Sequence, residues 1–449
     1  MNIRLILKTM GLIMIIEAAA MLLPMAVDLI YLEGMWGYFF TTSVALGAAG
    51  ALLYFFVHPK KNTLYQRDGY LIVALAWLVL SLAGALPFAV SGSTPSYLDA
   101  VFETVSGFTT TGSTVLADVE VLSHSMLFWR SFTHWLGGMG ILVFMLTIST
   151  VAGKGSAMHL MRAESPGPVT EKMTPKLVTT ARYLYLIYGA MTVIQVIALV
   201  IAGLPLFESI LVSFGTLATG GFAFLNSSLA TFTYAQQTIV TVFMLLSGVN
   251  FGLYYLLCTR KPKNMLKAIK NEELWWYLGI VAAVFLATSL NTYASGTFDT
   301  FGDAAHHSIF SVASIITTTG YSTVDMPALP WFSKAVLLML MYVGGCAGST
   351  AGGIKVSRIA IGFKAVKNYL KGVMHPRRVS STRFERKEIS DDVIRSVLLY
   401  IIITVMFAVG SIIIVSFDPI GNFSVSASAV ATTLNNNGVA LDSACGSFF

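Results

Sequence analysis

The stretch Phe108-Thr109-Thr110-Thr111-Gly112 decides the fold, because three more polar stretches of the same kind, each ending in glycine, follow it along the chain. The later stretches are Ala218-Thr219-Gly220-Gly221, Thr317-Thr318-Thr319-Gly320 and Asn435-Asn436-Asn437-Gly438. Their last glycines are separated by 109 residues (112 to 221), 99 residues (221 to 320) and 118 residues (320 to 438). This recurrence predicts four copies of one structural unit in the same orientation.

The residues that precede two of these stretches also match. Phe102 and Phe310 each lie ten residues before their glycine, and Ser106 and Ser314 each lie six residues before it. The apolar segment before each glycine is too short to cross a bilayer, which is typical of a re-entrant helix. Irregular backbone at membrane depth survives only inside protein or along a water-filled cavity, so four such loops predict a shared central axis.

The composition is that of an integral membrane protein. Of 449 residues, 55% are hydrophobic and 11% are charged, and the mean hydropathy is +0.74, which excludes an ordinary soluble globular protein. The segment Met1–Val27 carries Arg4 and Lys8 before its apolar run and has no clear cleavage site, which predicts a retained helix. Three irregularly spaced cysteines indicate neither a disulfide framework nor a metal site.

The apolar runs predict nine membrane crossings, of which the eighth is unusual because small residues interrupt it. They lie near Leu5–Val27, Trp36–Val57, Asp68–Val90, Ser125–Val151, Leu177–Ala202, Tyr234–Leu257, Leu274–Ala294, Trp331–Tyr369 and Val393–Phe417. Alternating loops collect the lysines and arginines on the side of Arg4 and Lys8, which the positive-inside rule assigns to the cytoplasm. The net charge of +6 therefore indicates topology and not nucleic-acid binding.

The repeat and the spans together predict an order of segments along the chain. We expect two leading transmembrane helices over 1–67, pore repeat 1 over 68–153, a cytoplasmic loop over 154–176, pore repeat 2 over 177–258, a cytoplasmic loop over 259–273, pore repeat 3 over 274–370 with an intramembrane gating loop over 344–353, a cytoplasmic loop over 371–392 and an incomplete pore repeat 4 over 393–449.

The four glycine-ended stretches are the candidate selectivity filter. A ring of backbone carbonyls can replace the water shell of a cation without adding a fixed charge that would trap the ion. Glycine makes the necessary backbone conformations accessible. A single such stretch is most simply a turn with a glycine cap, but four at equivalent places favour the filter. The candidate ion-binding residues are Thr110, Thr111, Gly112, Ala218, Thr219, Gly220, Gly221, Thr318, Thr319, Gly320, Asn435, Asn436, Asn437 and Gly438.

A run of small residues interrupts the eighth apolar segment and is the candidate gate. It comprises Gly344, Gly345, Cys346, Ala347, Gly348, Ser349, Thr350, Ala351, Gly352 and Gly353, and we add Lys355 at its cytoplasmic edge. The simpler alternative is tight helix packing through small residues. A phosphate-binding loop is excluded because glycine, lysine and serine or threonine are not adjacent here.

Isolated polar residues within the spans give weaker indications. Glu17 could be an ion ligand, although it lies outside the repeats and more simply meets a polar neighbour. His134, His306 and His307 could bind a metal or carry protons, but no carboxylate or cysteine stands at ligand spacing. These residues do not change the prediction of a pore.

The sequence resembles the Trk/Ktr/HKT superfamily of potassium transporters, and within it the bacterial TrkH subunits, over nearly its whole length. The matching stretches are Phe108–Gly112, His134–Gly140, Arg162–Pro168, Gly344–Arg358 and Thr433–Asn436. The resemblance implies an all-α integral membrane fold with two leading helices and four parallel helix–pore-loop–helix repeats around a central pore. It also implies that the four glycines form the filter and that residues 344–353 form an intramembrane gating loop.

The resemblance further implies the ion, the partners and the location. The expected function is potassium uptake across the bacterial cytoplasmic (inner) membrane, with sodium or protons as candidate coupled ions in a symport and with no cofactor other than potassium. The expected assembly is a homodimer regulated by a cytosolic nucleotide-binding Trk A subunit. The basic segments Lys261–Lys270 and Lys371–Lys387 are the expected docking faces.

One departure from the family concerns the end of the chain. Family members continue into a further helix after the fourth filter stretch, with an arginine near the gate, whereas only Val439–Phe449 follow Gly438 here. Eleven residues cannot cross a membrane, so we expect the chain to be truncated at its C-terminus and to lack the last helix.

Three alternatives stay open at this stage. A secondary transporter for a small solute would have inverted repeats, with equivalent loops on opposite sides of the membrane. An intramembrane enzyme would need paired catalytic groups within the spans, and no such pair is apparent, so the sequence predicts no enzyme. A truncated product that does not conduct ions is the third alternative.

Overall fold

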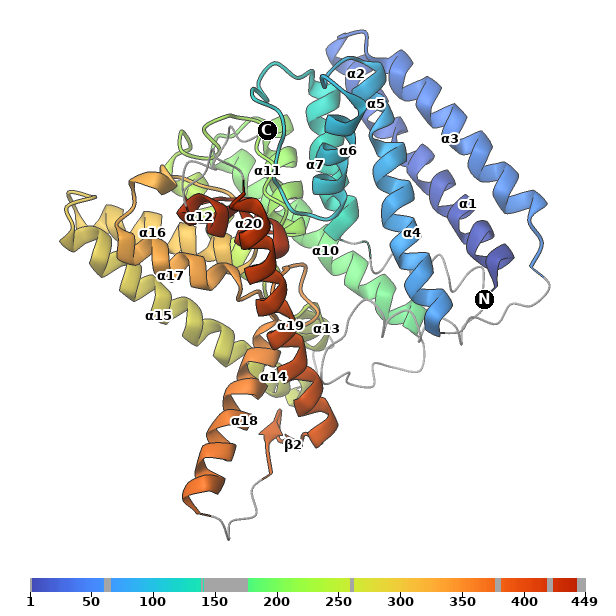
Figure 1. Ribbon diagram of the computed structural model, residues 1–449. Helices are drawn as coiled ribbons and strands as arrows, with labels where there is room; N and C mark the ends of the chain where they lie inside the picture. Colours follow the sequence, from blue (N-terminus) through green and yellow to red (C-terminus); the bar gives the residue numbers. More distant parts are fainter. Residues whose placement is uncertain are drawn as a thin grey trace. The chain divides into compact units, whose positions relative to one another are not determined.

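The computed structural model describes residues 2–59, 66–138, 140, 177–258, 262–375, 381–417 and 423–441 (Figure 1). The regular structure of this part of the chain is helical, apart from one hairpin of two short strands. The chain forms two compact units that divide between Ser228 and Leu229. The first unit therefore carries the first two filter stretches, and the second unit carries the other two and the gating loop.

The helices of the first unit lie in the segments predicted as the two leading helices, pore repeat 1 and the first half of pore repeat 2. They are α1 (Ile3–Ala20), α2 (Leu22–Tyr31), α3 (Trp36–Phe56), α4 (Gln66–Gly84), α5 (Leu86–Val90), α6 (Tyr97–Phe108), α7 (His124–Gly138), α10 (Leu177–Ile201) and α11 (Leu206–Ala218). Prolines explain two interruptions, because Pro24 and Pro87 stand in the first turns of α2 and α5 and cannot donate to the preceding turn. Helices α1 and α3 cross where a Cβ atom on Gly11 or Gly50 would come within 2.7 Å of the other glycine's carbonyl oxygen.

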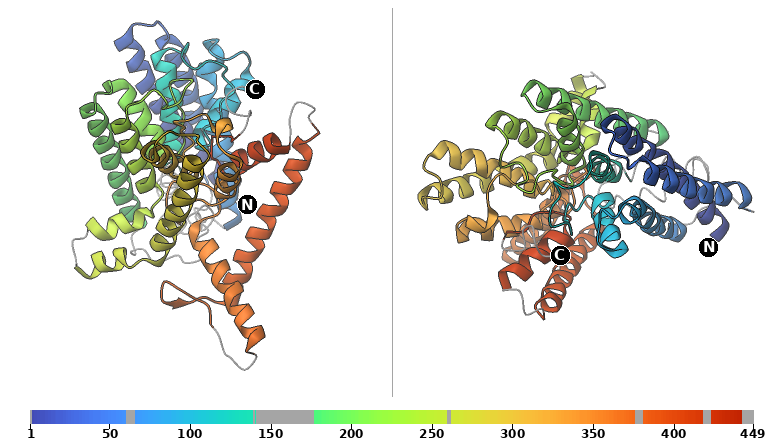
Figure 2. Two further views of the ribbon diagram at one scale, coloured as in Figure 1. Left: turned by 90° about the vertical axis from the view of Figure 1, so that its left-hand side faces the viewer. Right: turned by 90° about the horizontal axis from the view of Figure 1, so that it is seen from above.

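The second unit contains the second half of predicted pore repeat 2, the predicted pore repeats 3 and 4, and a short hairpin within the segment 371–392 that was predicted as a cytoplasmic loop. Its elements are α12 (Tyr234–Ser247), α13 (Phe251–Cys258), α14 (Pro262–Ile269), α15 (Glu272–Ala294), α16 (Phe301–Ile316), the short 3₁₀ helix η1 (Met326–Ala328), α17 (Trp331–Met341), α18 (Val356–Met374), β1 (Arg383–Phe384), β2 (Lys387–Glu388), α19 (Asp391–Val415) and α20 (Phe423–Leu434). Strands β1 and β2 are antiparallel, with Arg383 opposite Glu388. Helices α18 and α19 lie side by side beside this hairpin (Figures 1 and 2).

Each unit has its own apolar core. In the first unit, Phe39, Phe88, Phe108, Trp129 and Leu211 are among the buried residues that pack between the leading helices, α7 and α11. We call the short helices α6, α11, α16 and α20, which end at the glycine-ended stretches, pore helices. The core of the second unit packs residues of α16, including Ile315 and Ile316, against those of α15 and α17. The pore helices are thus fixed by packing on helices of the same unit.

The described residues include six helices that are long and apolar enough to cross a membrane. Helices α3, α10, α15 and α19 fall where the sequence predicts spans, whereas the predicted span Ser125–Val151 lies partly outside the described residues. The predicted span Tyr234–Leu257 is interrupted, because α12 and α13 are bent by 91° at the break between them. The eighth segment is also two helices, α17 and α18, with non-helical backbone between them.

Candidate ion-conducting site

The four glycine-ended stretches share one backbone conformation. In each, the glycine and the residue two positions before it have positive φ: 57° and 81° for Thr110 and Gly112, 56° and 76° for Thr219 and Gly221, 55° and 88° for Thr318 and Gly320, and 56° and 72° for Asn436 and Gly438. Positive φ is uncommon outside glycine and is strained for a β-branched threonine. The chain therefore holds four copies of one uncommon backbone conformation, and in three of them a β-branched threonine stands at the first positive-φ position.

The same two hydrogen bonds tie each stretch to the pore helix before it. The amide two residues before the glycine donates to the carbonyl three residues back, and the next amide donates to the carbonyl five residues back. These pairs are Thr110 to Gly107 and Thr111 to Ser106, Thr219 to Thr216 and Gly220 to Gly215, Thr318 to Ile315 and Thr319 to Ser314, and Asn436 to Thr433 and Asn437 to Thr432. The bonds occupy the carbonyls at the helix ends, which would otherwise be unpaired.

A hydroxyl group at the end of the pore helix fixes the far side of three stretches. Ser106, Ser314 and Thr432 each lie six residues before the glycine and donate to the carbonyl of the residue after it. The distances are 2.5 Å to Ser113, 2.7 Å to Tyr321 and 2.5 Å to Val439. The serines that the sequence places in register therefore have a defined structural role, which the third stretch shares with the first.

The second stretch is held differently, because Gly215 occupies the hydroxyl position. His134 of α7 lies against the stretch instead: its ring stacks on Phe222 with the centroids 4.0 Å apart, and the Phe222 amide donates to its Nδ1 over 3.4 Å. A Cβ atom on Gly220 would come within 2.4 Å of this ring. His134 is thus a packing partner of the filter stretch.

A buried ion pair joins the segments that follow the first two filter stretches. Arg130 of α7 donates its Nε to Glu103 of α6, and their side chains are 3% and 0% exposed. Glu103 also accepts from the Thr114 hydroxyl at 3.0 Å, while Arg130 donates through Nη1 to the Ala223 carbonyl at 2.7 Å. The pair therefore links the chain segments that follow both stretches, and the Glu103 charge is balanced by Arg130.

Asn226 links the same two segments nearer the surface. Its side-chain amide donates to Asp118 over 2.8 Å, and its side-chain oxygen accepts from the Val119 amide at 3.0 Å. The hydrogen bond from Asn226 holds the pKa of Asp118 below its usual range. The loops of the first unit are thus tied together by side chains at two levels.

The third and fourth filter stretches are in direct contact within the second unit. A Cβ atom on Gly320 would lie 2.4 Å from the Asn437 carbonyl oxygen, so only glycine fits there. The Asn437 side chain is fully buried and donates to the Ile315 carbonyl at the end of α16 over 3.1 Å. Asn437 thereby fixes the fourth stretch to the third pore helix.

The predicted gating loop lies against these two stretches. The Gly352 amide donates to the Thr318 hydroxyl over 2.6 Å, and a Cβ atom on Gly352 would be 2.5 Å from the Asn435 carbonyl oxygen. The two ends of the loop are bridged, because Gly344 donates to Ile354 over 2.9 Å and Ile354 donates to Tyr342 over 3.0 Å. Small residues are therefore required by close backbone approach, and simple helix packing does not describe this segment.

The break between α12 and α13 interlocks with the gating loop. The Cys346 amide donates to the Gly248 carbonyl over 2.8 Å, and the Phe251 amide donates to the Gly348 carbonyl over 3.0 Å. Sequence reasoning missed this contact. The sequence Gly248-Val249-Asn250 inside an apolar run was the available signal, because glycine and asparagine both disfavour a helix interior.

Glu273 at the start of α15 was also missed. Its carboxylate accepts from the Ala347 amide at 2.7 Å and from the Ser357 amide at 3.1 Å, and the residue is only 5% exposed. Lys355 donates its ammonium group to the Ala351 carbonyl. No spacing in the sequence relates Glu273 to a loop that begins 71 residues later, at Gly344.

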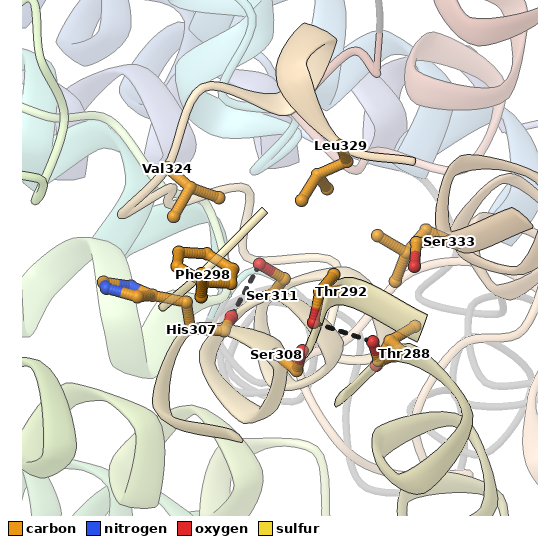
Figure 3. A pocket seen from close by; sticks show the side chains of 10 residues that line it. Thr288, Thr292, Phe298, His307, Ser308, Ser311, Val324, Leu329 and Ser333 are labelled. Carbon is orange, nitrogen blue, oxygen red and sulfur yellow. Dashed lines mark hydrogen bonds between the residues drawn. The ribbon is translucent and has the colours of Figure 1, made fainter. Parts of the chain in front are cut away.

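A small cavity of about 10 Å³ lies beside α16, away from the predicted site residues (Figure 3). Its lining includes Thr292 and Ser311, whose hydroxyls donate to carbonyls of their own helices at 2.9 Å. His307 also lines the cavity and hydrogen bonds to Thr323 over 2.9 Å. The described residues contain no group of three or more His, Cys, Asp or Glu side chains that could hold a metal ion.

Comparison with known proteins assigns the chain to a family. The family model TrkH, described as cation transport protein, matches residues 37–443. The chain belongs to the TrkH family.

Two curated relatives support this membership. The Trk system potassium uptake protein TrkH of Salmonella typhimurium is 36% identical over 98% of this chain and 91% of its own length. The Trk system potassium uptake protein TrkG of Escherichia coli is 33% identical over all of this chain and 92% of its own length. The crystal structure of the potassium transporter TrkH from Vibrio parahaemolyticus matches with a TM-score of 0.88 at 33% identity, covering 99% of this chain and 92% of that one.

Membership in the TrkH family confirms the predicted fold class, since the similarity to the crystal structure extends over nearly the whole chain. The protein is an all-α, multi-pass protein of the cytoplasmic (inner) membrane, and its family consists of cation transport proteins and not of enzymes. The last eight residues of the chain lie outside the described part.

Proposed function

We propose that this TrkH-family protein takes up potassium ions through one pore, with the four glycine-ended stretches as its selectivity filter. The observation that carries the proposal is the backbone conformation that the stretches share, with positive φ at the same two positions in all four. Equivalent backbones present equivalent carbonyl groups, which is what a ring of ion ligands needs.

The pore helices contribute to cation preference. Helices α6, α11, α16 and α20 each end within three residues of their glycine-ended stretch, so their partly negative C-terminal ends adjoin the proposed ion positions. In the first unit the Glu103 charge is offset by Arg130, so backbone dipoles supply the attraction there. The membrane potential then drives potassium inward, and sodium or protons are the candidate coupled ions.

The loop over 344–353 is the proposed gate, because it contacts Thr318 and Asn435 of the filter stretches. A cytosolic nucleotide-binding subunit of the Trk A type would regulate this loop by docking on the basic segments Lys261–Lys270 and Lys371–Lys387. We propose a homodimer as the assembly. Copurification with a tagged Trk A subunit, and its loss when these lysines are replaced by glutamine, tests the docking faces.

Rescue of growth in cells that lack potassium uptake tests the proposed function. Gly112→Ser and Gly320→Ser place a side chain at φ values of 81° and 88°, so both should reduce uptake and the preference for potassium over sodium. Gly189→Ser, in α10 with open space around it, is the matched control. Rescue that is equal for all three variants would contradict the filter assignment.

A further inference from the structure

One carboxylate holds the gating loop in two places. Glu273 accepts from Ala347 within the loop and from Ser357 in the first turn of α18, at 2.7 and 3.1 Å. Because the residue is 5% exposed, water competes little for these hydrogen bonds, and a charged acceptor makes them stronger than neutral ones. The position of the loop therefore depends on the position of the N-terminus of α15.

A second carboxylate fixes that N-terminus from the cytoplasmic hairpin. Glu385, in the turn between β1 and β2, accepts from the backbone amides of Glu272 and Glu273 at 2.8 and 3.3 Å. The contact is reciprocal, because the Glu385 amide donates to the Glu272 side chain over 3.0 Å. Glu272 in turn forms an ion pair with Lys364 of α18. The amide of Glu273 is thus held by the hairpin, and its side chain holds the gating loop.

The hairpin is a rigid element and not a loose linker. Phe384 is 2% exposed and packs in a cluster with Ile361 of α18 and Val397 of α19. Its turn residues Glu385 and Arg386 have φ values of 52° and 61°, which strain residues other than glycine. Packing around Phe384 maintains this strained turn, so a force on the hairpin is transmitted to the amides that Glu385 accepts.

We propose that Glu385 and Glu273 are positioning residues that connect the cytoplasmic hairpin to the gating loop and hold the loop against the filter. The connection runs from Glu385 to the backbone of Glu273, from the Glu273 side chain to Ala347 and Ser357, and from Gly352 to Thr318. Displacement of the hairpin withdraws the hydrogen bonds from the α15 amides and releases the loop from the filter. This inference rests on the proposed function of residues 344–353 as a gate.

Potassium flux into proteoliposomes, measured without any cytosolic partner, tests the connection. Glu273→Gln and Glu385→Gln remove the charge of one acceptor each, and both should raise the flux about threefold or more, with the potassium-to-sodium ratio unchanged. The double variant should conduct no more than Glu273→Gln alone, because both residues act through the same contact. Glu388→Gln, at an exposed position of the same hairpin, is the matched control and should leave the flux unchanged.

A merely structural role would lower the flux together with the thermal unfolding midpoint. Flux that is unchanged or lower in Glu385→Gln, with a normal unfolding midpoint, overturns the proposal, and this variant decides the outcome if Glu273→Gln does not fold. Gly320→Ser in the same assay distinguishes a failure of the pore assignment from a failure of the proposed connection. If Gly320→Ser leaves the flux intact, the pore assignment fails; if it abolishes the flux while Glu385→Gln has no effect, only the connection fails.

Discussion

Gly220 shows how a single residue is fixed by its neighbour. Its φ is not positive, so its backbone conformation does not require glycine. The requirement comes from His134, whose ring atoms would lie 2.4 to 2.7 Å from a Cβ atom. His134 therefore takes the place, in the second repeat, of the hydroxyl that fixes the other three filter stretches.

Gly220→Ala should cost roughly 1–3 kcal/mol of stability by overpacking and should lower potassium uptake by about tenfold, since the ring and the filter stretch must move apart. Thermal unfolding in detergent and uptake into cells measure the two effects. Gly189→Ala, also in the first unit but with nothing within 4 Å of its Cβ position, should leave uptake unchanged. Equal uptake by both alanine variants would show that His134 does not restrain the filter.

The Glu103–Arg130 pair predicts a strong dependence of one residue on the other. Arg130→Met leaves a buried carboxylate without its partner and should cost about 3–5 kcal/mol. Glu103→Gln combined with Arg130→Met should cost less than the sum of the two single changes, as measured by thermal unfolding. Lys334→Met is the control, because Lys334 is partly exposed and its ammonium only lies 5.0 Å from the Trp331 ring. Additive costs for the pair would contradict a coupled buried ion pair.

At the scale of elements, the structure that recurs is a pore helix together with its glycine-ended stretch. Two backbone hydrogen bonds recur in all four of these pairs of pore helix and stretch, and a hydrogen bond from a side-chain hydroxyl recurs in three of them. The side chains differ between repeats, since asparagines replace threonines in the fourth. Asn435 nevertheless donates to the carbonyl four residues back, as Thr317 does in the third repeat. The conformation is therefore kept while the side chains change.

Ser314→Ala tests the hydroxyl hydrogen bond between a pore helix and its stretch. It removes the donor to the Tyr321 carbonyl in a fully buried place, which should cost about 1–3 kcal/mol and lower the preference for potassium over sodium. Ser289→Ala is the matched control, since the Ser289 hydroxyl is equally buried but donates only to Phe285 of its own helix. Ion competition during uptake measures the preference. A change of selectivity in the control, or none in Ser314→Ala, would refute the role of the hydroxyl.

At the scale of the whole molecule, the chain divides into two units with two filter stretches each. If all four stretches line one pore, one altered glycine changes the entire potassium current. Gly221→Ser in the first unit and Gly438→Ser in the second, at φ values of 76° and 72°, should therefore each reduce the whole current, and the double variant should leave about the product of the two remaining fractions. Current recordings from purified protein in planar bilayers measure this. If each variant removed half the current and the pair removed all of it, the units would conduct separately.

The sequence predicted the elements better than their interruptions. Helices such as α3 and α15 follow from runs of about 20 apolar residues, because the bilayer itself demands that length. The 91° bend after Ser247 was missed, although Gly248 and Asn250 marked it, because hydropathy averages over a window and does not register a short break. No spacing in the sequence pairs Arg130 with Glu103, yet the two side chains form a buried ion pair.

By itself, the sequence determined the membrane class and the fourfold recurrence of the glycine-ended stretches, because hydropathy and repeat spacing are local properties of the chain. Only the tertiary structure decided what holds those stretches and the loop over 344–353: His134 lies against Gly220, Asn437 donates to Ile315, and Glu273 accepts from Ala347. The paired residues are 74 positions apart for Glu273 and Ala347, 86 for His134 and Gly220, and 122 for Ile315 and Asn437. No periodicity encodes such pairs, because they arise only when packing brings separate helices together.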